Sequence, residues 1–512
     1  MLLETPDIAS SGLSEAWAVW LPIALITLSV VAMWWVELRS RRFDLLAAKN
    51  IFLVAFCLHF VVWPAWVLLA GYETVGTVRI TFTTARYQAA VYGLWCAFLG
   101  LLAFLAGYYG SALAWRGQTP SPASELRPHW KPFNYVIAAL SLLSVISFIR
   151  LVTASGGLTD FLASTEQFRN FHLLGTGYLM WGMNLMYLAF VAAYIARLRE
   201  KRGRFLAPAL LAGSVAMGML GAFRHMAVES FASWLVIRHY AARRVKLRAW
   251  MAAAAVAFLL LNGIYVMLRS ARWDVGLALS RIAGLGDAVF YGIFSRFHGA
   301  ESAARIVEGC DAIGFPGGRF LLTDLLAFPI PRFLWDDKPT SFGAAVNVTF
   351  FRESFTDPRQ TGAAVSSLIG SLYFIGGLTA VLVGMLLIGA LLAAGQYLVK
   401  RRQDLLGLGV YVQVYIFALF VNESLDLHFI RLVYRTLLWL TLLLLCTSRR
   451  RPAYPHQLYA FSPEGIRHRV WLQSQSYPAP FAHAKFYAPP AFPVRAARTH
   501  QKPSQDLDQL HH

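Results

Sequence analysis

Histidine and arginine recur at helical spacing in an apolar stretch near the C-terminal end of the chain. His428, Arg431 and Arg435 are three and four residues apart, so a helix would place all three on one face. A helix rises about 1.5 Å per residue, which would put Arg435 about 10 Å deeper than His428. Because a guanidinium suits phosphate oxygens, this face predicts anion binding. In the alternative, Arg435 pairs with a carboxylate such as Glu229 and ties two helices together.

A second polar cluster opens another apolar stretch and contains Arg224, His225 and Glu229. His225 and Glu229 are four residues apart and would share a helical face, where the carboxylate could orient the imidazole as a general base. A histidine beside a membrane is also commonly a polar rim residue, and both roles stay open. Arg224 and Arg269, which follows a further apolar stretch, are candidate phosphate ligands.

The third cluster lies in a segment with three prolines, Phe328-Pro-Ile-Pro331-Arg332-Phe-Leu-Trp-Asp-Asp-Lys338-Pro339, preceded by Arg319. Proline fixes the backbone, so this segment would hold Arg332 and Lys338 on a rigid element beside the membrane. Arg319, Arg332 and Lys338 are therefore candidate phosphate ligands. The alternative is an amphipathic loop whose bases contact lipid head groups.

The composition indicates the class of protein in which these clusters lie. Of 512 residues, 57% are hydrophobic and 14% charged, about half the charged share of a globular protein. These values exclude an ordinary soluble enzyme and predict an integral membrane protein. The four cysteines show no pairing pattern, so neither a disulfide nor a cysteine metal site is expected.

We expect an all-α polytopic membrane bundle, because eleven stretches approach the roughly 20 apolar residues that a spanning helix needs. The predicted spans are Ala16–Val36, Ile51–Ala70, Ala89–Ala114, Phe133–Thr153, Gly177–Ala196, Phe205–Phe223, Met226–Tyr240, Trp250–Met267, Leu372–Tyr397, Leu405–Val421 and Phe429–Cys446.

Basic residues predict the orientation of this bundle. Lys and Arg concentrate in the connections after alternate spans, at 39–49, 116–131, 197–204, 243–248 and 400–402, and positive segments remain cytoplasmic. The N-terminus is then periplasmic and the C-terminus cytoplasmic. Much of the formal charge of +19 serves orientation, so nucleic acid is not an expected partner.

Two regions depart from the pattern of span and short connection. Within a transmembrane domain at 1–448, residues 269–366 form a long outer connection, which we expect to be partly helical and functional. Residues 449–512 hold nine of the 22 prolines and predict a disordered, basic cytoplasmic tail.

The proline-rich segment from Pro331 to Pro339 resembles the Pro-Arg and Lys-Pro segment of bacterial oligosaccharide repeat unit polymerases of the Wzy type. The resemblance extends to Ser155-Gly-Gly-Leu, to Arg169, to Gly175-Thr-Gly177-Tyr and to the turn from Gly221 to Arg224. It covers roughly Ile51 to Cys446.

This resemblance implies an inverting glycosyltransferase of the bacterial inner membrane that polymerises polyprenyl-pyrophosphate-linked repeat units into O-antigen or exopolysaccharide on the periplasmic face. A chain-length regulator and a flippase would be further partners. The part of the sequence expected on the outer side shows no Asp-x-Asp signature, so arginine and lysine, rather than a metal or other cofactor, would neutralise the pyrophosphate. The implied catalytic residues are His225, Glu229, Arg332 and His428. The implied pyrophosphate ligands are Arg224, Arg269, Arg319, Arg332, Lys338, Arg431 and Arg435.

Two other functions share parts of this pattern. An O-antigen ligase would use the same donor, outer loop and arginines with a different acceptor. A lipid-linked oligosaccharide flippase or another transporter would be expected to line the membrane midplane with charge, whereas this sequence gathers charge at one end of its spans.

Overall fold

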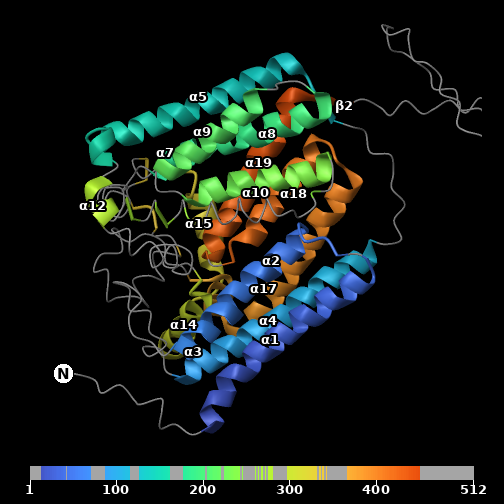
Figure 1. The fold of residues 1–512 in the computed structure, drawn as a ribbon, viewed down its shortest axis with the longest axis vertical. Coiled ribbons are helices and arrows are strands. Elements are labelled where there is room, and N and C mark those ends of the chain that lie inside the picture. Colours follow the sequence, from blue (N-terminus) through green and yellow to red (C-terminus); the bar gives the residue numbers. More distant parts are fainter. Residues whose placement is uncertain are drawn as a thin grey trace, which may run out of the picture. The chain divides into compact units, whose positions relative to one another are not determined.

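The computed structural model describes residues 13–41, 43–70, 87–115, 126–161, 177–201, 205–220, 224–242, 297–330, 366–421 and 423–449, with short pieces at 245, 260, 263–264, 267–268, 271, 275–280, 334–335, 337–339 and 342. The predicted tail beyond Arg449 and much of the predicted outer connection lie outside these residues. Figure 1 shows that the described part is a set of packed helices.

The N-terminal helices follow the first three predicted spans. They are α1 (Leu13–Arg39), α2 (Ala48–Cys57), a π-helical turn η1 (Leu58–Val62), α3 (Trp63–Ala70) and α4 (Tyr87–Ala114). The second predicted span is thus one rod with a π-helical turn in its middle, at buried His59.

The middle helices form a second group, in which α5 packs against α7 and α8, and α8 packs against α9 and α10. Their bounds are α5 (Trp130–Ala154), α7 (Gly177–Met183), α8 (Leu185–Glu200), α9 (Leu206–Leu220) and α10 (Arg224–Ala241). Asn184 separates α7 from α8, and its side-chain amide donates to the Met180 carbonyl oxygen at 3.0 Å.

The predicted outer connection contains helices that pack into the bundle. They are α12 (Val275–Ser280), α14 (Gly299–Ile313) and α15 (Arg319–Ala327). In α14 the small buried side chains of Ala300, Ala303 and Ala304 allow close approach to α4 and α17. Helix α15 packs against α19. This segment is therefore a partly helical element of the bundle.

The last three helices are α17 (Leu368–Arg401), α18 (Leu405–Leu419) and α19 (Leu425–Cys446). The rod of α17 breaks at Gly376 and Gly377, whose backbone angles are not helical. Asp404 caps α18 by accepting a hydrogen bond from the Gly407 amide at 3.0 Å. Beyond α19, β2 (Thr447–Arg449) pairs antiparallel with β1 (Leu126–Pro128).

Seven of the described helical stretches are long and apolar enough to cross a membrane: Trp17–Arg39, Ala48–Trp66, Gln88–Ala114, Trp130–Ala154, Tyr178–Arg199, Leu368–Arg401 and Leu425–Cys446. The predicted spans at α9 and α18 are helices but shorter, with 15 residues each. Most of the predicted span Trp250–Met267 lies outside the described residues. The chain is thus a multi-pass helical membrane protein, and the count of eleven spans stays a prediction.

Contacts between helix ends agree with the prediction that successive connections alternate between the two sides of the membrane. Tyr240, at the end of α10, donates to Asp44 Oδ2 after α1 at 2.8 Å. Arg199, at the end of α8, donates to Gln403 Oε1 after α17 at 3.1 Å. Connections that the sequence assigns to one side of the membrane therefore meet at one end of the bundle.

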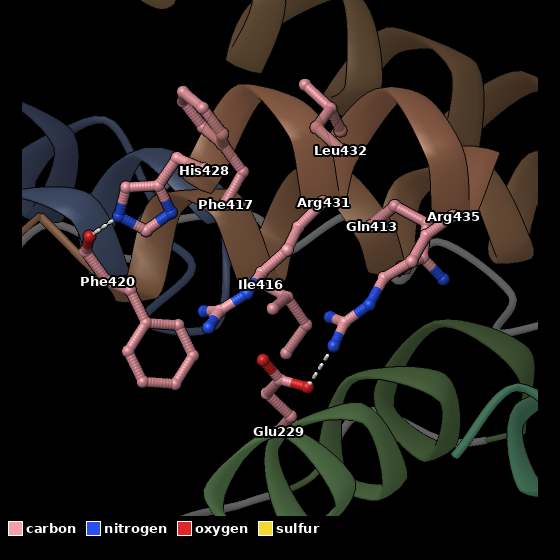
Figure 2. Close-up of a pocket in the computed structure, with 9 residues that line it drawn as sticks. All are labelled: Glu229, Gln413, Ile416, Phe417, Phe420, His428, Arg431, Leu432 and Arg435. Atoms are coloured by element: carbon pink, nitrogen blue, oxygen red, sulfur yellow. Dashed lines mark hydrogen bonds and ion pairs between the residues drawn. The ribbon is translucent and has the colours of Figure 1, made fainter. Parts of the chain in front are cut away.

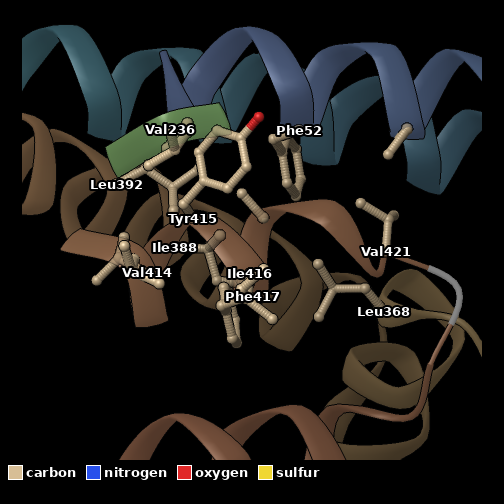
Figure 3. Packing of buried hydrophobic residues seen from close by; sticks show 14 of the residues in the cluster. Phe52, Val236, Leu368, Ile388, Leu392, Val414, Tyr415, Ile416, Phe417 and Val421 are labelled. Carbon is tan, nitrogen blue, oxygen red and sulfur yellow. The ribbon is translucent and has the colours of Figure 1, made fainter. Parts of the chain in front are cut away.

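The core near this end is apolar and draws on helices distant in sequence. Figure 3 shows Phe52 of α2, Val236 of α10, Leu392 of α17 and Tyr415 of α18 in one cluster. All four are buried, so α18 is held inside the bundle although it is short.

Candidate functional site

The predicted cationic face lines a pocket. His428, Arg431 and Arg435 project from one side of α19, and Glu229 of α10 approaches from the opposite wall (Figure 2). The pocket is small and partly open to the surface, with room for about one water-sized group between its walls. It therefore suits a single functional group of a larger ligand, not a whole sugar.

Arg435 forms a buried ion pair at the deeper end of the pocket. Its Nη2 donates to Glu229 Oε2 at 2.8 Å and to Asn184 Oδ1 at 2.9 Å, and its guanidinium lies 5.0 Å from the centre of the Tyr187 ring. The side chain of Glu229 is 0% exposed. The Arg435–Glu229 pairing offered as the alternative to anion binding is therefore present, while phosphate binding by Arg435 stays a prediction.

Arg431, which lines the pocket, forms a second ion pair with Glu423. Burial opposes ionisation of Glu423, but the charges of Arg431, His428 and His225 outweigh it and lower its pKa to about 2. His428 hydrogen-bonds the Phe420 carbonyl oxygen through Nε2. Because a carbonyl only accepts, that nitrogen carries a hydrogen.

Several polar atoms along this pocket are buried without a hydrogen-bond partner among the described residues. They are Glu229 Oε1, Arg435 Nε and both amide atoms of Gln413. Gln413 lies in the apolar helix α18 and is not among the predicted site residues. The signal that marks it is an amide side chain inside an otherwise apolar span, where a polar group is costly.

Helix α15 brings part of the outer connection beside the site. Tyr434 of α19 donates to the Leu325 carbonyl oxygen at 2.6 Å, and Asp324 Oδ2 accepts from the Phe342 amide at 2.6 Å. Burial raises the pKa of Asp324 to about 7, the Phe342 hydrogen bond opposes the rise, and nearby Asp426 adds to it.

The structure describes only some of the remaining predicted site residues. Arg319 is exposed, with its guanidinium 5.6 Å from the centre of the Phe320 ring. Lys338 Nζ donates to the Ile330 carbonyl oxygen at 2.9 Å, and neither Arg319 nor Lys338 lines the pocket. His225 is half-buried near Glu423. The side chain of Arg224 and all of Arg269 and Arg332 lie outside the described residues.

The structure thus brings together Glu229, His428, Arg431 and Arg435 in one pocket, and adds Gln413. Among the residues that the structure describes, no three of His, Cys, Asp and Glu are placed to hold a metal ion. Compared with known proteins, the sequence matches no family model, no curated protein and no solved structure. Function is therefore inferred from the chemistry of the pocket.

Proposed function

We propose that this chain is a membrane glycosyltransferase that joins polyprenyl-pyrophosphate-linked oligosaccharide repeat units into a polysaccharide on the periplasmic face of the bacterial inner membrane. The observation that carries the proposal is a pair of arginines on one face of α19, lining a pocket inside an apolar helical bundle. Apolar helices provide surface for the prenyl chain, and the guanidinium groups provide donors for the diphosphate.

Both arginines retain donors although each is paired with a carboxylate. A guanidinium has five N–H groups, and Arg435 uses those on Nη2 for Glu229 and Asn184. Its Nε hydrogen faces no acceptor among the described residues. Arg431 contacts Glu423 through Nη1. The free N–H groups of the two side chains would contact the pyrophosphate oxygens.

In the proposed reaction a sugar hydroxyl of one repeat unit attacks the anomeric carbon of the other. The new C–O bond forms as the C–O bond to pyrophosphate breaks, and the anomeric configuration inverts. The hydroxyl proton passes to a base, for which His225, Glu229 and His428 are the candidates. The pyrophosphate leaves as an anion, stabilised by arginine in the low-dielectric pocket. Arg332, Lys338 and the other predicted ligands would extend this set from the outer connection.

A first prediction separates the role of the Arg435–Glu229 pair in function from its role in stability. Arg435→Met alone should lower stability by about 3–5 kcal/mol, because Glu229 is left as an unpaired buried charge. The double variant Glu229→Leu/Arg435→Met removes both charges and should fold about as stably as the parent. We expect it to form no polymer ladder from lipid-linked repeat units, whereas the parent forms one even with a chelator present.

The control is thermal unfolding of all three proteins in the same detergent. A parental ladder from the folded double variant would refute the assigned site, and a strict requirement for divalent metal would refute arginine as the neutralising group. The glycan of a deletion strain then separates polymerase from ligase. Single repeats at the cell surface indicate loss of a polymerase, and accumulated lipid-linked polymer indicates loss of a ligase.

A further inference from the structure

Two buried glutamines of neighbouring helices differ in their hydrogen bonding. Gln396 of α17 is satisfied, because its Nε2 donates to the Tyr240 hydroxyl at 3.1 Å and its Oε1 accepts from the Tyr411 hydroxyl at 2.7 Å. Gln413 of α18 is 2% exposed, and neither of its amide atoms makes a hydrogen bond of normal geometry among the described residues. Its polar neighbour is the Tyr187 hydroxyl, which interacts with the Gln413 side chain but is itself bonded to Ser233 Oγ at 2.9 Å.

An unsatisfied buried amide is expensive. Leaving a buried donor or acceptor without a partner costs about 1–3 kcal/mol, and replacing it with an apolar group of similar shape is close to neutral or stabilising. A leucine at position 413 would fit the apolar sequence of α18 and avoid that cost. Gln413 is therefore better explained by a ligand than by the packing of α18.

The unpartnered atoms on this pocket define the kind of group that would satisfy them. Arg435 Nε and Gln413 Nε2 donate, whereas Glu229 Oε1 and Gln413 Oε1 accept. A phosphate oxygen would use only the donors and would leave both acceptors without a partner. A hydroxyl both donates and accepts, so it can use an atom of each kind.

We propose that the deep part of this pocket binds a sugar hydroxyl of the lipid-linked substrate, held between Glu229 Oε1 and the Gln413 amide. This inference rests on the proposed function, and it divides the pocket between two parts of the substrate. The hydroxyl lies beside the neutralised pair of Arg435 and Glu229, and the diphosphate contacts the remaining guanidinium donors nearer Arg431. Gln413 then distinguishes a carbohydrate from a bare prenyl pyrophosphate, and the arginines do not.

The test compares the binding of two lipids to the full-length protein in nanodiscs. One is polyprenyl pyrophosphate without sugar, and the other is the lipid-linked oligosaccharide extracted from cells that lack this gene. Gln413→Leu should weaken binding of the oligosaccharide lipid at least about tenfold while leaving polyprenyl pyrophosphate binding unchanged. Its melting temperature should equal or exceed that of the parent. Gln413→Asn, which keeps both amide groups, should restore part of the affinity.

Gln396→Leu is the matched control. It removes a satisfied amide and leaves the Tyr240 and Tyr411 hydroxyls with one partner fewer, so it should lower the melting temperature without changing the affinity of the folded protein for either lipid. Equal affinity of the parent and Gln413→Leu for the oligosaccharide lipid would overturn the hydroxyl site, and so would a drop in melting temperature as large as that of Gln396→Leu. If the parent binds neither lipid, the proposed function itself fails.

Discussion

At the scale of single residues, the charge of the neighbours decides how buried carboxyl groups behave. Glu423 faces Arg431 and two histidines, and its pKa falls to about 2 despite burial. Asp324 lies near both Asp426 and Lys338, and burial, the largest effect, raises its pKa to about 7. Opposite charge favours the ionised form, whereas desolvation and like charge favour the neutral form.

The raised pKa of Asp324 predicts that the stability of the protein depends on pH. An unfolded aspartate ionises near pH 4, whereas folded Asp324 stays protonated until about pH 7. As the pH rises through this window, the unfolded state loses a proton that the folded state keeps, and stability falls. Asp324→Asn should match the parent near pH 4 and exceed its stability by about 2–4 kcal/mol above pH 7. Thermal unfolding between pH 4 and pH 8 measures the difference.

The control for this prediction is Asp311→Asn, which neutralises an exposed carboxylate of α14. It should change stability by no more than about 0.5 kcal/mol at any pH in this range. If Asp324→Asn follows the parent across the whole range, then Asp324 is not held neutral in the folded protein.

The sequence was sufficient to predict which side chains share one face of a helix. It predicted that His428, Arg431 and Arg435 share a face, and it offered Glu229 as the partner of Arg435, which is confirmed. An amide inside the apolar run of α18 marks Gln413, but the chain alone does not report that this amide lacks well-formed hydrogen bonds after folding. The raised pKa of Asp324 likewise depends on burial against α19.

At the scale of helices, α17 is interrupted near its N-terminal end. Gly377 has φ = 66° and ψ = −153°, a conformation that is essentially restricted to glycine. A Cβ atom at Gly377 would lie 3.0 Å from the Phe315 ring. The break lets the first turns of α17 lie buried against α14 before the rod continues.

Gly377→Ala should therefore destabilise the protein by about 1–3 kcal/mol, because alanine is strained in this conformation and contacts Phe315 closely. Gly110→Ala is the control, because Gly110 lies exposed within helix α4 and no atom lies within 4 Å of an added Cβ, so this substitution should not lower stability. Thermal unfolding of both variants measures the effect. Equal changes in stability from the two substitutions would show that α17 continues through this point without the break.

Helix type and approximate position followed from apolar runs, but the interior geometry of helices did not. The sequence treated Leu372–Tyr397 as one span, because a Gly-Gly pair inside an apolar run has the same hydropathy whether or not the helix breaks. It also placed α14 in an outer connection, although α14 packs on α4 and α17. That packing depends on alanines whose role is visible only once the partner helices are in place.

At the scale of the whole molecule, the ends of the bundle differ in chemistry. Ser40 follows α1 at the end where Asp44, Tyr240 and the basic connections gather. Thr323 lies on α15, next to Asp324, which is close to Asp426 in the first turn of α19. Because basic connections remain cytoplasmic, the end with Ser40 is predicted to face the cytoplasm and the end with Thr323 the periplasm.

Cysteine labelling at positions 40 and 323 tests this orientation, because the side chains of Ser40 and Thr323 are both exposed. In intact spheroplasts, Thr323→Cys should react with a membrane-impermeant maleimide, whereas Ser40→Cys should react only after permeabilisation. The unmodified chain is the control for the four native cysteines, three of which are buried. If only Ser40→Cys reacts in intact spheroplasts, the bundle has the opposite orientation to the one predicted. The arginine pocket would then face the cytoplasm, which contradicts the proposed reaction on the periplasmic face.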